Sequence, residues 1–237
     1  MRVRRLEREI MDNPALQAEQ HFDALRGLER LNRWSRSTSI VWPAIQKLAS
    51  QDTGRTLHIL DIATGGGDIP LGIHQRALMA GIPLKVSGCD FSARTLEYAR
   101  QRAREAKAEI EFFEFNALRD VLPGDYDVVL SSLFLHHLDT GQAEDLLRKM
   151  ARGATQMVLI NDLERTRTGL ILAHVATRLL TSSKVVRADG PQSVRAAFTL
   201  NEVRAIAERA GLDNITLVRR WPSRFLLTWA RKGRPKA

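Results

Sequence analysis

The sequence predicts an α/β protein with a doubly wound sheet of seven strands, and two observations carry that prediction. From residue 57 onward, apolar runs typical of strands alternate with helical segments of about 10–15 residues, which is the pattern of parallel strand–helix units. The last two strand-like runs, 215–219 and 225–230, are separated only by residues 220–224. A parallel crossover needs about a dozen residues or more, so the seventh strand is expected to be antiparallel to the sixth if the two pair.

Two helices are expected ahead of the sheet. Residues 15–33 form an amphipathic pattern, with apolar side chains near helical spacing, and a second helix is expected over 39–49. A polar break with a glycine follows at 51–55. We therefore expect a helical lid over residues 1–50 and a main domain over residues 51–237.

The strand–helix units follow one another from residue 57 to residue 161. Strands are expected at 57–61, 84–90, 110–115, 126–131 and 157–161. Helices are expected at 70–80, 92–106, 140–150 and, later in the chain, 200–210. Ser92 is a suitable N-cap for the second of these, and Gly211 is a suitable stop for the last.

The segment 162–198 is longer than an ordinary strand-to-helix connection. It is expected to hold one apolar helix and then a polar stretch around residues 189–191. We interpret it as a cap over the substrate, with Leu172 and Val175 among the apolar residues that contact the acceptor. A helix that fills the core or forms a dimer interface is an equal alternative, so both a monomer and a homodimer remain open.

Charge and cysteine content exclude several classes of protein. Most of the net charge of +9 falls in residues 1–8 and 231–237, which favours solvated basic tails over a nucleic-acid surface. Weak attraction of these tails to an anionic membrane or to RNA is the alternative. A single cysteine excludes a disulfide framework and a thiolate zinc cluster, and no HExxH motif occurs, so no metal is expected. With no apolar run of ~20 residues and no secretory signal, a cytoplasmic location is expected.

A glycine cluster follows the first expected strand. The strand ends at Asp61, and Gly65, Gly66 and Gly67 permit a tight turn before the next helix, whose N-terminus would face a ligand. Pro70 stands where a dinucleotide fingerprint has its third glycine. A carboxylate before the glycines favours a ligand with an amino group over a pyrophosphate, although the glycines alone are also compatible with a bare turn.

Asp90 supports the nucleoside interpretation. It ends the second expected strand, about 20 residues after the glycines, where an acid accepts hydrogen bonds from ribose hydroxyls. A solvated or helix-capping aspartate is the alternative. Together, the two acids and the glycines predict a nucleoside at the carboxyl edge of the sheet.

These motifs resemble those of class I S-adenosylmethionine-dependent methyltransferases, which have a Rossmann-like sheet. Asp61, Ala63, Gly65 and Gly67 are in register with the first motif of the family, with Ala63 in place of a glycine. Asn116-Ala117 stands where the family often has Asp-Ala at the adenine, and residues 126–138 resemble its fourth motif. The resemblance implies S-adenosylmethionine as cofactor, S-adenosylhomocysteine as product, and cofactor contacts from Asp61, Ala63, Thr64, Gly65, Gly67, Asp90, Phe91, Asn116, Ala117 and Ser132.

The resemblance extends to small-molecule methyltransferases of the quinone and polyketide type. It implies methyl transfer to an apolar or aromatic acceptor, and O-methylation of a phenolic or polyketide-type acceptor is favoured. His136 and His137 are the candidate bases, although one histidine of such a pair often only packs against the loop. Besides Leu172 and Val175, the expected acceptor contacts are Trp34, Arg36, Leu133 and His137.

Other functions are kept as alternatives. They are C-methylation of a quinone ring, methylation of RNA with the basic tails as the binding element, a cofactor-binding partner without activity, and a dehydrogenase. Nothing in residues 131–138 resembles the Asn-Pro-Pro-aromatic motif of nucleic-acid methyltransferases, which argues against DNA as a substrate.

Overall fold

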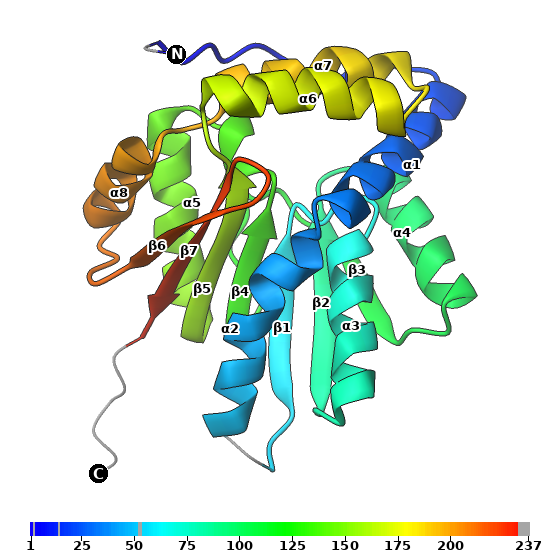
Figure 1. The fold of residues 1–237 in the computed structure, drawn as a ribbon. Helices are drawn as coiled ribbons and strands as arrows, with labels where there is room; N and C mark the ends of the chain where they lie inside the picture. The colour runs from blue at the N-terminus through cyan, green and yellow to red at the C-terminus, as the bar shows by residue number, and fades with distance from the viewer. Residues whose placement is uncertain (2, 14, 52–53, 232–237) are drawn as a thin grey trace.

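The protein is built around one mixed sheet. The structure, a computed structural model, describes residues 1, 3–13, 15–51 and 54–231. The strand order is β3-β2-β1-β4-β5-β7-β6 (Figure 1). The strands are β1 (Leu57–Ile62), β2 (Leu84–Asp90), β3 (Ile110–Glu114), β4 (Tyr126–Ser132), β5 (Ala154–Leu163), β6 (Thr216–Arg220) and β7 (Arg224–Ala230).

The pairing of the strands confirms the predicted topology. Strands β1 to β5 are parallel, and β7 is antiparallel to both of its neighbours, β5 and β6. This is the doubly wound, Rossmann-like sheet that the sequence predicts, with its antiparallel last strand. In this topology the parallel strands all end at one edge, where ligands of open α/β sheets bind.

Eight α-helices and two short 3-10 turns occur among the described residues. The helices are α1 (Ala18–Trp34), α2 (Ser37–Gln51), α3 (Asp68–Ala80), α4 (Ala93–Glu105), α5 (Thr140–Gly153), α6 (Arg167–Leu180), α7 (Lys184–Ala196) and α8 (Leu200–Arg209). The turns are η1 (Ile10–Asp12) and η2 (Leu135–His137). Side-chain caps define several helix starts: Ser92 accepts a hydrogen bond from the Thr95 backbone, and α5 and α8 begin with full capping boxes.

The core lies on both faces of the sheet, because successive side chains of a strand point to opposite faces. Leu57 and Ile59 of β1 pack against α2 and α3, whereas Leu60 and Ile62 pack on the face covered by α5 and α8. Helix α2 therefore forms part of the layer on the sheet. Within residues 1–50, it is α1 and the segment before it that extend over the carboxyl edge (Figure 1).

Helices α6 and α7 lie side by side above the carboxyl edge of the sheet, with α1 next to them (Figure 1). The helices approach closely through small residues. A Cβ at Gly27 of α1 would lie 3.2 Å from the Val186 side chain of α7, and Gly190 of α7 packs on Thr177 of α6. These three helices form the roof of the molecule, and we call them the cap helices.

Residues 189–191 lie inside α7, so the prediction of a polar stretch at this point was wrong. The Asp189 carboxylate accepts hydrogen bonds from two backbone N–H groups of η1, each at 3.0 Å. Gly190 is held against α6. These tertiary contacts override the poor helix propensity of glycine and proline, and they come from residues far away in the sequence.

The amino-terminal segment agrees only in part with the prediction of a solvated basic tail, because Arg5 and Arg8 are exposed whereas Arg4 is bound to the rest of the protein. The guanidinium of Arg4 lies 3.6 Å above the Phe198 ring and donates hydrogen bonds to the backbone carbonyls of His136, Leu138 and Ala196. Arg2 and residues 232–237, which belong to the predicted tails, lie outside the described residues. Within the part of the chain that the structure describes, no helix is long and apolar enough to cross a membrane.

Candidate functional site

A cavity lies between the carboxyl edge of the sheet and the cap helices. Its volume is about 1300 Å³, including the open space at its mouth. The floor comes from the turn after β1 and from the ends of β4 and β5, and the roof comes from α1, α6 and α7. The cavity is thus the place where the sequence predicts a nucleoside and an acceptor to meet.

The turn after β1 has backbone conformations that few residues adopt easily. Gly65 and Gly67 have φ values of 55° and 75°, in the left-handed region. Ala63 also lies there, at 56°, which explains why a glycine is the more common residue at its position in the motif. A Cβ added at Gly65 would meet no atom within 4 Å, so this glycine leaves open space beside the turn.

Asp61 is the buried acid at this turn, and it is only 1% exposed. Its Oδ2 accepts a hydrogen bond from the Thr64 hydroxyl at 2.8 Å, whereas its Oδ1 has no hydrogen-bond partner among the described residues. Burial raises the pKa of Asp61 well above its ordinary value. An unpartnered carboxylate oxygen at a cavity wall is an acceptor that lacks its donor.

Asp90 lies on the far side of the same turn and braces it. Its Oδ2 accepts from the Gly65 N–H and its Oδ1 from the Ser92 N–H, both at 3.0 Å. Burial raises its pKa in spite of these hydrogen bonds. Phe91 beside it is 63% exposed, and neither residue lies in the wall of the main cavity.

The residues after β3 and β4 differ in their relation to the cavity. Asn116 Oδ1 accepts hydrogen bonds from the backbone of Leu118 and Arg119, and Ala117 is buried in the core, so both lie outside the cavity wall. Ser132 and Leu133 line the cavity. Leu133 has a φ of 57°, a second strained position at the strand ends that face the ligand space.

Both histidines of η2 line the cavity, and carboxylates surround them. His136 is buried, and its Nδ1 lies 2.7 Å from Asp162 Oδ1. Burial alone would lower the pKa of His136, but Asp162 and Glu9 outweigh it and raise the pKa to about 10. His136 therefore keeps a proton at neutral pH in this arrangement, and it cannot take up another one as a general base.

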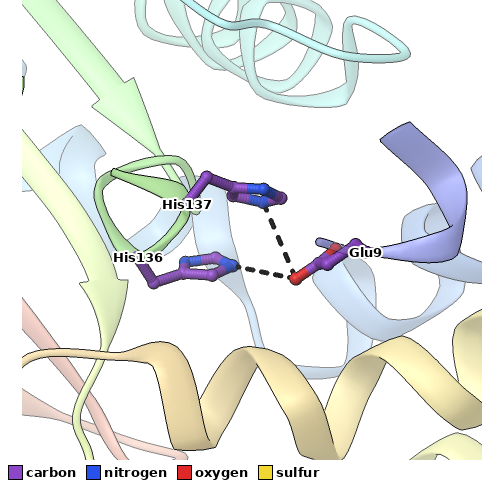
Figure 2. A group of neighbouring side chains, drawn as sticks. All are labelled: Glu9, His136 and His137. Atoms are coloured by element: carbon purple, nitrogen blue, oxygen red, sulfur yellow. Dashed lines mark ion pairs between the residues drawn. The ribbon is translucent and has the colours of Figure 1, made fainter. Parts of the chain in front are cut away.

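His137 is partly exposed and faces the same carboxylate of Glu9. Its Nε2 lies 3.8 Å from Glu9 Oε1 (Figure 2). Its Nδ1 lies 3.2 Å from Asp12 Oδ2. Glu9 was not expected at the site, because it precedes α1 and lies outside every motif in the sequence. It reaches the histidines because the segment before α1 is hydrogen-bonded to α7 through Ser193 and Asp189.

The cap contributes some of the expected acceptor contacts and not others. Trp34 and Leu172 line the cavity. Arg36 lies in a separate surface hollow beside α3, and Val175 is 49% exposed and outside the cavity wall. Leu172 and Val175 are three residues apart and lie near one face of α6, so helical periodicity alone could not separate them.

Arg224 is a further residue of the cavity wall that the sequence did not indicate. It begins β7, is 5% exposed, and donates hydrogen bonds to Ser37 and to Asn32 Oδ1. Burial lowers its pKa to about 10. It links the strand to α1 and α2, and the only signal in the sequence would have been a charge within an apolar strand.

Comparison with known proteins agrees with the geometry of the turn. Residues 59–156 match the sequence profile of a family described as a methyltransferase domain. This chain carries a methyltransferase domain. The match runs from within β1 to the first residues of β5 and contains Asp61, the glycine turn, Asp90 and both histidines.

The domain has a relative in Thermus thermophilus, a demethylmenaquinone methyltransferase. The two are 36% identical over 104 residues, which are 43% of this chain and 46% of the relative. The match thus spans about half of the relative's length.

Solved structures of methyltransferases share the fold over most of the chain. A plantazolicin methyltransferase superimposes with a TM-score of 0.66 and 15% identity, over 92% of this chain and 94% of the other. The magnesium protoporphyrin IX methyltransferase of Synechocystis gives 0.58 and 17%, over 94% and 91%. The domain therefore has the Rossmann-like fold of class I methyltransferases.

Proposed function

We propose that this protein is an S-adenosylmethionine-dependent methyltransferase that acts on a small apolar or aromatic acceptor, with O-methylation of a phenolic or polyketide-type acceptor favoured. The observation that carries the proposal is the unpartnered Oδ1 of Asp61 at the glycine turn. A buried carboxylate oxygen without a donor fits the ammonium group of the cofactor's methionine portion. The solved neighbour from Synechocystis was crystallised with S-adenosylhomocysteine, which agrees with this assignment.

The other cofactor contacts follow from the turn. Gly65 leaves room beside the backbone, and Asp90 can accept hydrogen bonds from ribose hydroxyls through its remaining lone pairs. We also assign cofactor contacts to Ala63, Thr64, Gly67 and Ser132. The adenine side of the proposed site is formed by Phe91, Asn116 and Ala117, next to the ends of β2 and β3. Bound S-adenosylmethionine supplies an electrophilic methyl group.

The chain itself would hold the acceptor and exclude water. The cap helices present apolar groups to the cavity, among them Leu28, Leu172 and Ala176, while Leu133 forms part of the floor. We propose that α1 with the preceding segment and residues 162–198 act together as the cap. Enclosing the reaction in this way contributes to rate mainly through positioning and exclusion of water.

An oxygen acceptor must lose its hydroxyl proton during the transfer, and of the two histidines beside the cavity we assign the role of general base to His137. Both histidines line the cavity, and His137 is the more accessible, with its side chain 23% exposed against 5% for His136. His136 is bound to Asp162 and serves to position its neighbour. The proposed acceptor contacts are then Trp34, Leu133, His137 and Leu172.

The test is calorimetric titration of the purified chain with S-adenosylhomocysteine. The wild type should bind, and Asp61→Asn should bind about 10- to 100-fold more weakly, because the mutation removes a charge-assisted hydrogen bond. Asp90→Asn should also weaken binding. Glu111→Gln, on an exposed face of β3, is the matched control and should bind like the wild type.

NAD serves as the second ligand in the same experiment. Binding of NAD in place of S-adenosylhomocysteine would overturn the proposal in favour of a dehydrogenase. If Asp61→Asn binds with unchanged affinity, the assignment of Asp61 as a ligand contact is wrong, whichever of the two ligands binds.

C-methylation of a quinone ring is the second candidate function. Its support is the 36% identity to the demethylmenaquinone methyltransferase over 104 residues. Incubating the enzyme with a phenol and with a quinol, and locating the new methyl group by NMR, separates the two reactions. Methylation of RNA has less support, because the Arg4 guanidinium is bound to backbone carbonyls.

A further inference from the structure

Three side chains from distant parts of the sequence meet in the wall of the cavity. They are Glu9, from the segment before α1, and His136 and His137 of η2 (Figure 2). One potential ligand atom from each residue lies within 4.8 Å of the others. Glu9 Oε1 lies 3.7 Å from His136 Nε2 and 3.8 Å from His137 Nε2.

These separations are too long for hydrogen bonds but close to those of metal ligands. Ligand atoms about 2.1 Å from a zinc ion lie roughly 3.4 Å apart at tetrahedral angles. The two distances to Glu9 Oε1 exceed that value by a few tenths of an ångström, and no two of the three ligand atoms are more than 4.8 Å apart, so a contraction of the cluster would place all three around one ion. Figure 2 shows both imidazole rings directed toward the same carboxylate oxygen.

The carboxylates that contact the other ring nitrogen of each histidine are also typical of a metal site. His136 Nδ1 lies 2.7 Å from Asp162, and His137 Nδ1 lies 3.2 Å from Asp12. A metal-binding histidine usually donates its second ring N–H to a carboxylate, which fixes the tautomer and leaves Nε2 free to bind the ion. Both histidines have this partner, and the Ser193 hydroxyl contacts the Glu9 carboxylate.

We propose that Glu9, His136 and His137 bind one divalent transition-metal ion of the zinc type, with an open coordination position toward the cavity. Two imidazoles and one carboxylate are typical of mononuclear zinc and iron sites, whereas magnesium and calcium prefer oxygen ligands. All three ligands line the cavity, so a hydroxyl or carbonyl oxygen of a small acceptor can complete the coordination.

The charge of the cluster favours such an ion. Glu9, Asp12 and Asp162 bring three carboxylates to two imidazoles, and Glu9 and Asp162 are mostly buried. A bound ion would add positive charge among these carboxylates and would ease the loss of the proton from a coordinated hydroxyl, a consequence that rests on the proposed methyl transfer.

The test measures metal binding and does not depend on activity. The full chain is treated with EDTA, desalted and titrated with Co²⁺, while ligand-field absorption is recorded, and zinc binding is measured by calorimetry. One ion per chain is expected, with the intense bands of a four- or five-coordinate site, and Mg²⁺ should not compete. Glu9→Gln should weaken binding about tenfold or more, whereas Glu7→Gln, in the same segment, should bind like the wild type.

Asp12→Asn gives a second variant that leaves the buried ligands in place. Asp12 is 43% exposed at its side chain, and its loss as a partner of His137 should weaken zinc binding roughly 10- to 100-fold.

A spectrum of hydrated Co²⁺ only, or equal affinity in Glu9→Gln and Glu7→Gln, would overturn the site. Binding of S-adenosylhomocysteine is measured on the same samples. If it persists while metal binding is absent, the metal site fails and the proposed function stands.

Discussion

At the scale of single residues, Asp61 shows how a binding site is kept at a cost to stability. Its side chain is buried, its Oδ1 has no partner among the described residues, and burial raises its pKa. Because the pKa is higher in the folded state, the ionised carboxylate opposes folding as the pH rises above its ordinary value. We predict that Asp61→Asn unfolds at neutral pH at the same temperature as the wild type or above it, while its cofactor affinity falls. Thermal unfolding of Asp61→Asn is compared with that of Asp213→Asn, an exposed control. A loss of stability in Asp61→Asn alone would contradict this prediction.

Asp127 is the opposite case, a buried acid that stabilises the fold. It accepts hydrogen bonds from Arg55, at 2.8 and 3.0 Å, and from the His58 N–H at 2.8 Å. Burial alone would raise its pKa, but these donors and those of β5 lower it to about 2. The stabilisation is therefore present above the unfolded value of 3.8 and is lost as the pH falls toward 2.

We predict that Asp127→Asn lowers the free energy of unfolding by about 2 kcal/mol at pH 7, from the size of the pKa shift. Denaturant titrations of both proteins between pH 7 and pH 2 check this, and the two curves should converge at the acid end. A constant difference across that range would show that the charge is not responsible. Cofactor affinity should not change, because Asp127 lies at the opposite edge of the sheet from the cavity.

At the scale of elements, the packing of α2 on α3 depends on a glycine. A Cβ at Gly72 would lie 2.9 Å from Thr38 Cγ2 and closer still to its hydroxyl. We predict that Gly72→Ala costs about 1–3 kcal/mol of unfolding free energy, and that adding Thr38→Ala restores most of it. Gly141→Ala is the control, since its nearest neighbour would be at 3.5 Å. Urea titrations decide the point, and an equal loss in the double mutant would contradict it.

The elements that sequence predicts best are those with local signals. Apolar runs located all seven strands, and Ser92 and Gly211 marked helix ends that the structure confirms. The helix through residues 189–191 could not be predicted, because the contacts that stabilise it come from η1 and α6. Glu9 could not be predicted for the same reason. Tertiary packing brings it to the site, and the sequence around it contains no motif.

At the scale of the whole molecule, a rigid sheet carries a cap made of separate segments. The strands β1, β4 and β5 are buried on both faces, whereas the cap helices have large exposed apolar side chains, such as Ile171 and Leu179 of α6. We predict that S-adenosylhomocysteine and an acceptor together slow amide exchange in α1, α6 and α7, and leave the central strands unchanged. Hydrogen-exchange mass spectrometry tests this. Equal protection of cap and strands would indicate global stabilisation instead of closure.

The cap also contains its own optical signal. Trp34 at the end of α1 and Trp221 in the turn before β7 lie with ring centroids 4.7 Å apart and planes inclined at 56°. Two indoles at this distance and angle couple their electronic transitions, so the resting protein should show a paired band of opposite signs in ultraviolet circular dichroism. Lifting α1 from the turn would remove that band, as would Trp34→Phe or Trp221→Phe. The opening of the cavity can therefore be followed in real time on the unlabelled protein, with light alone.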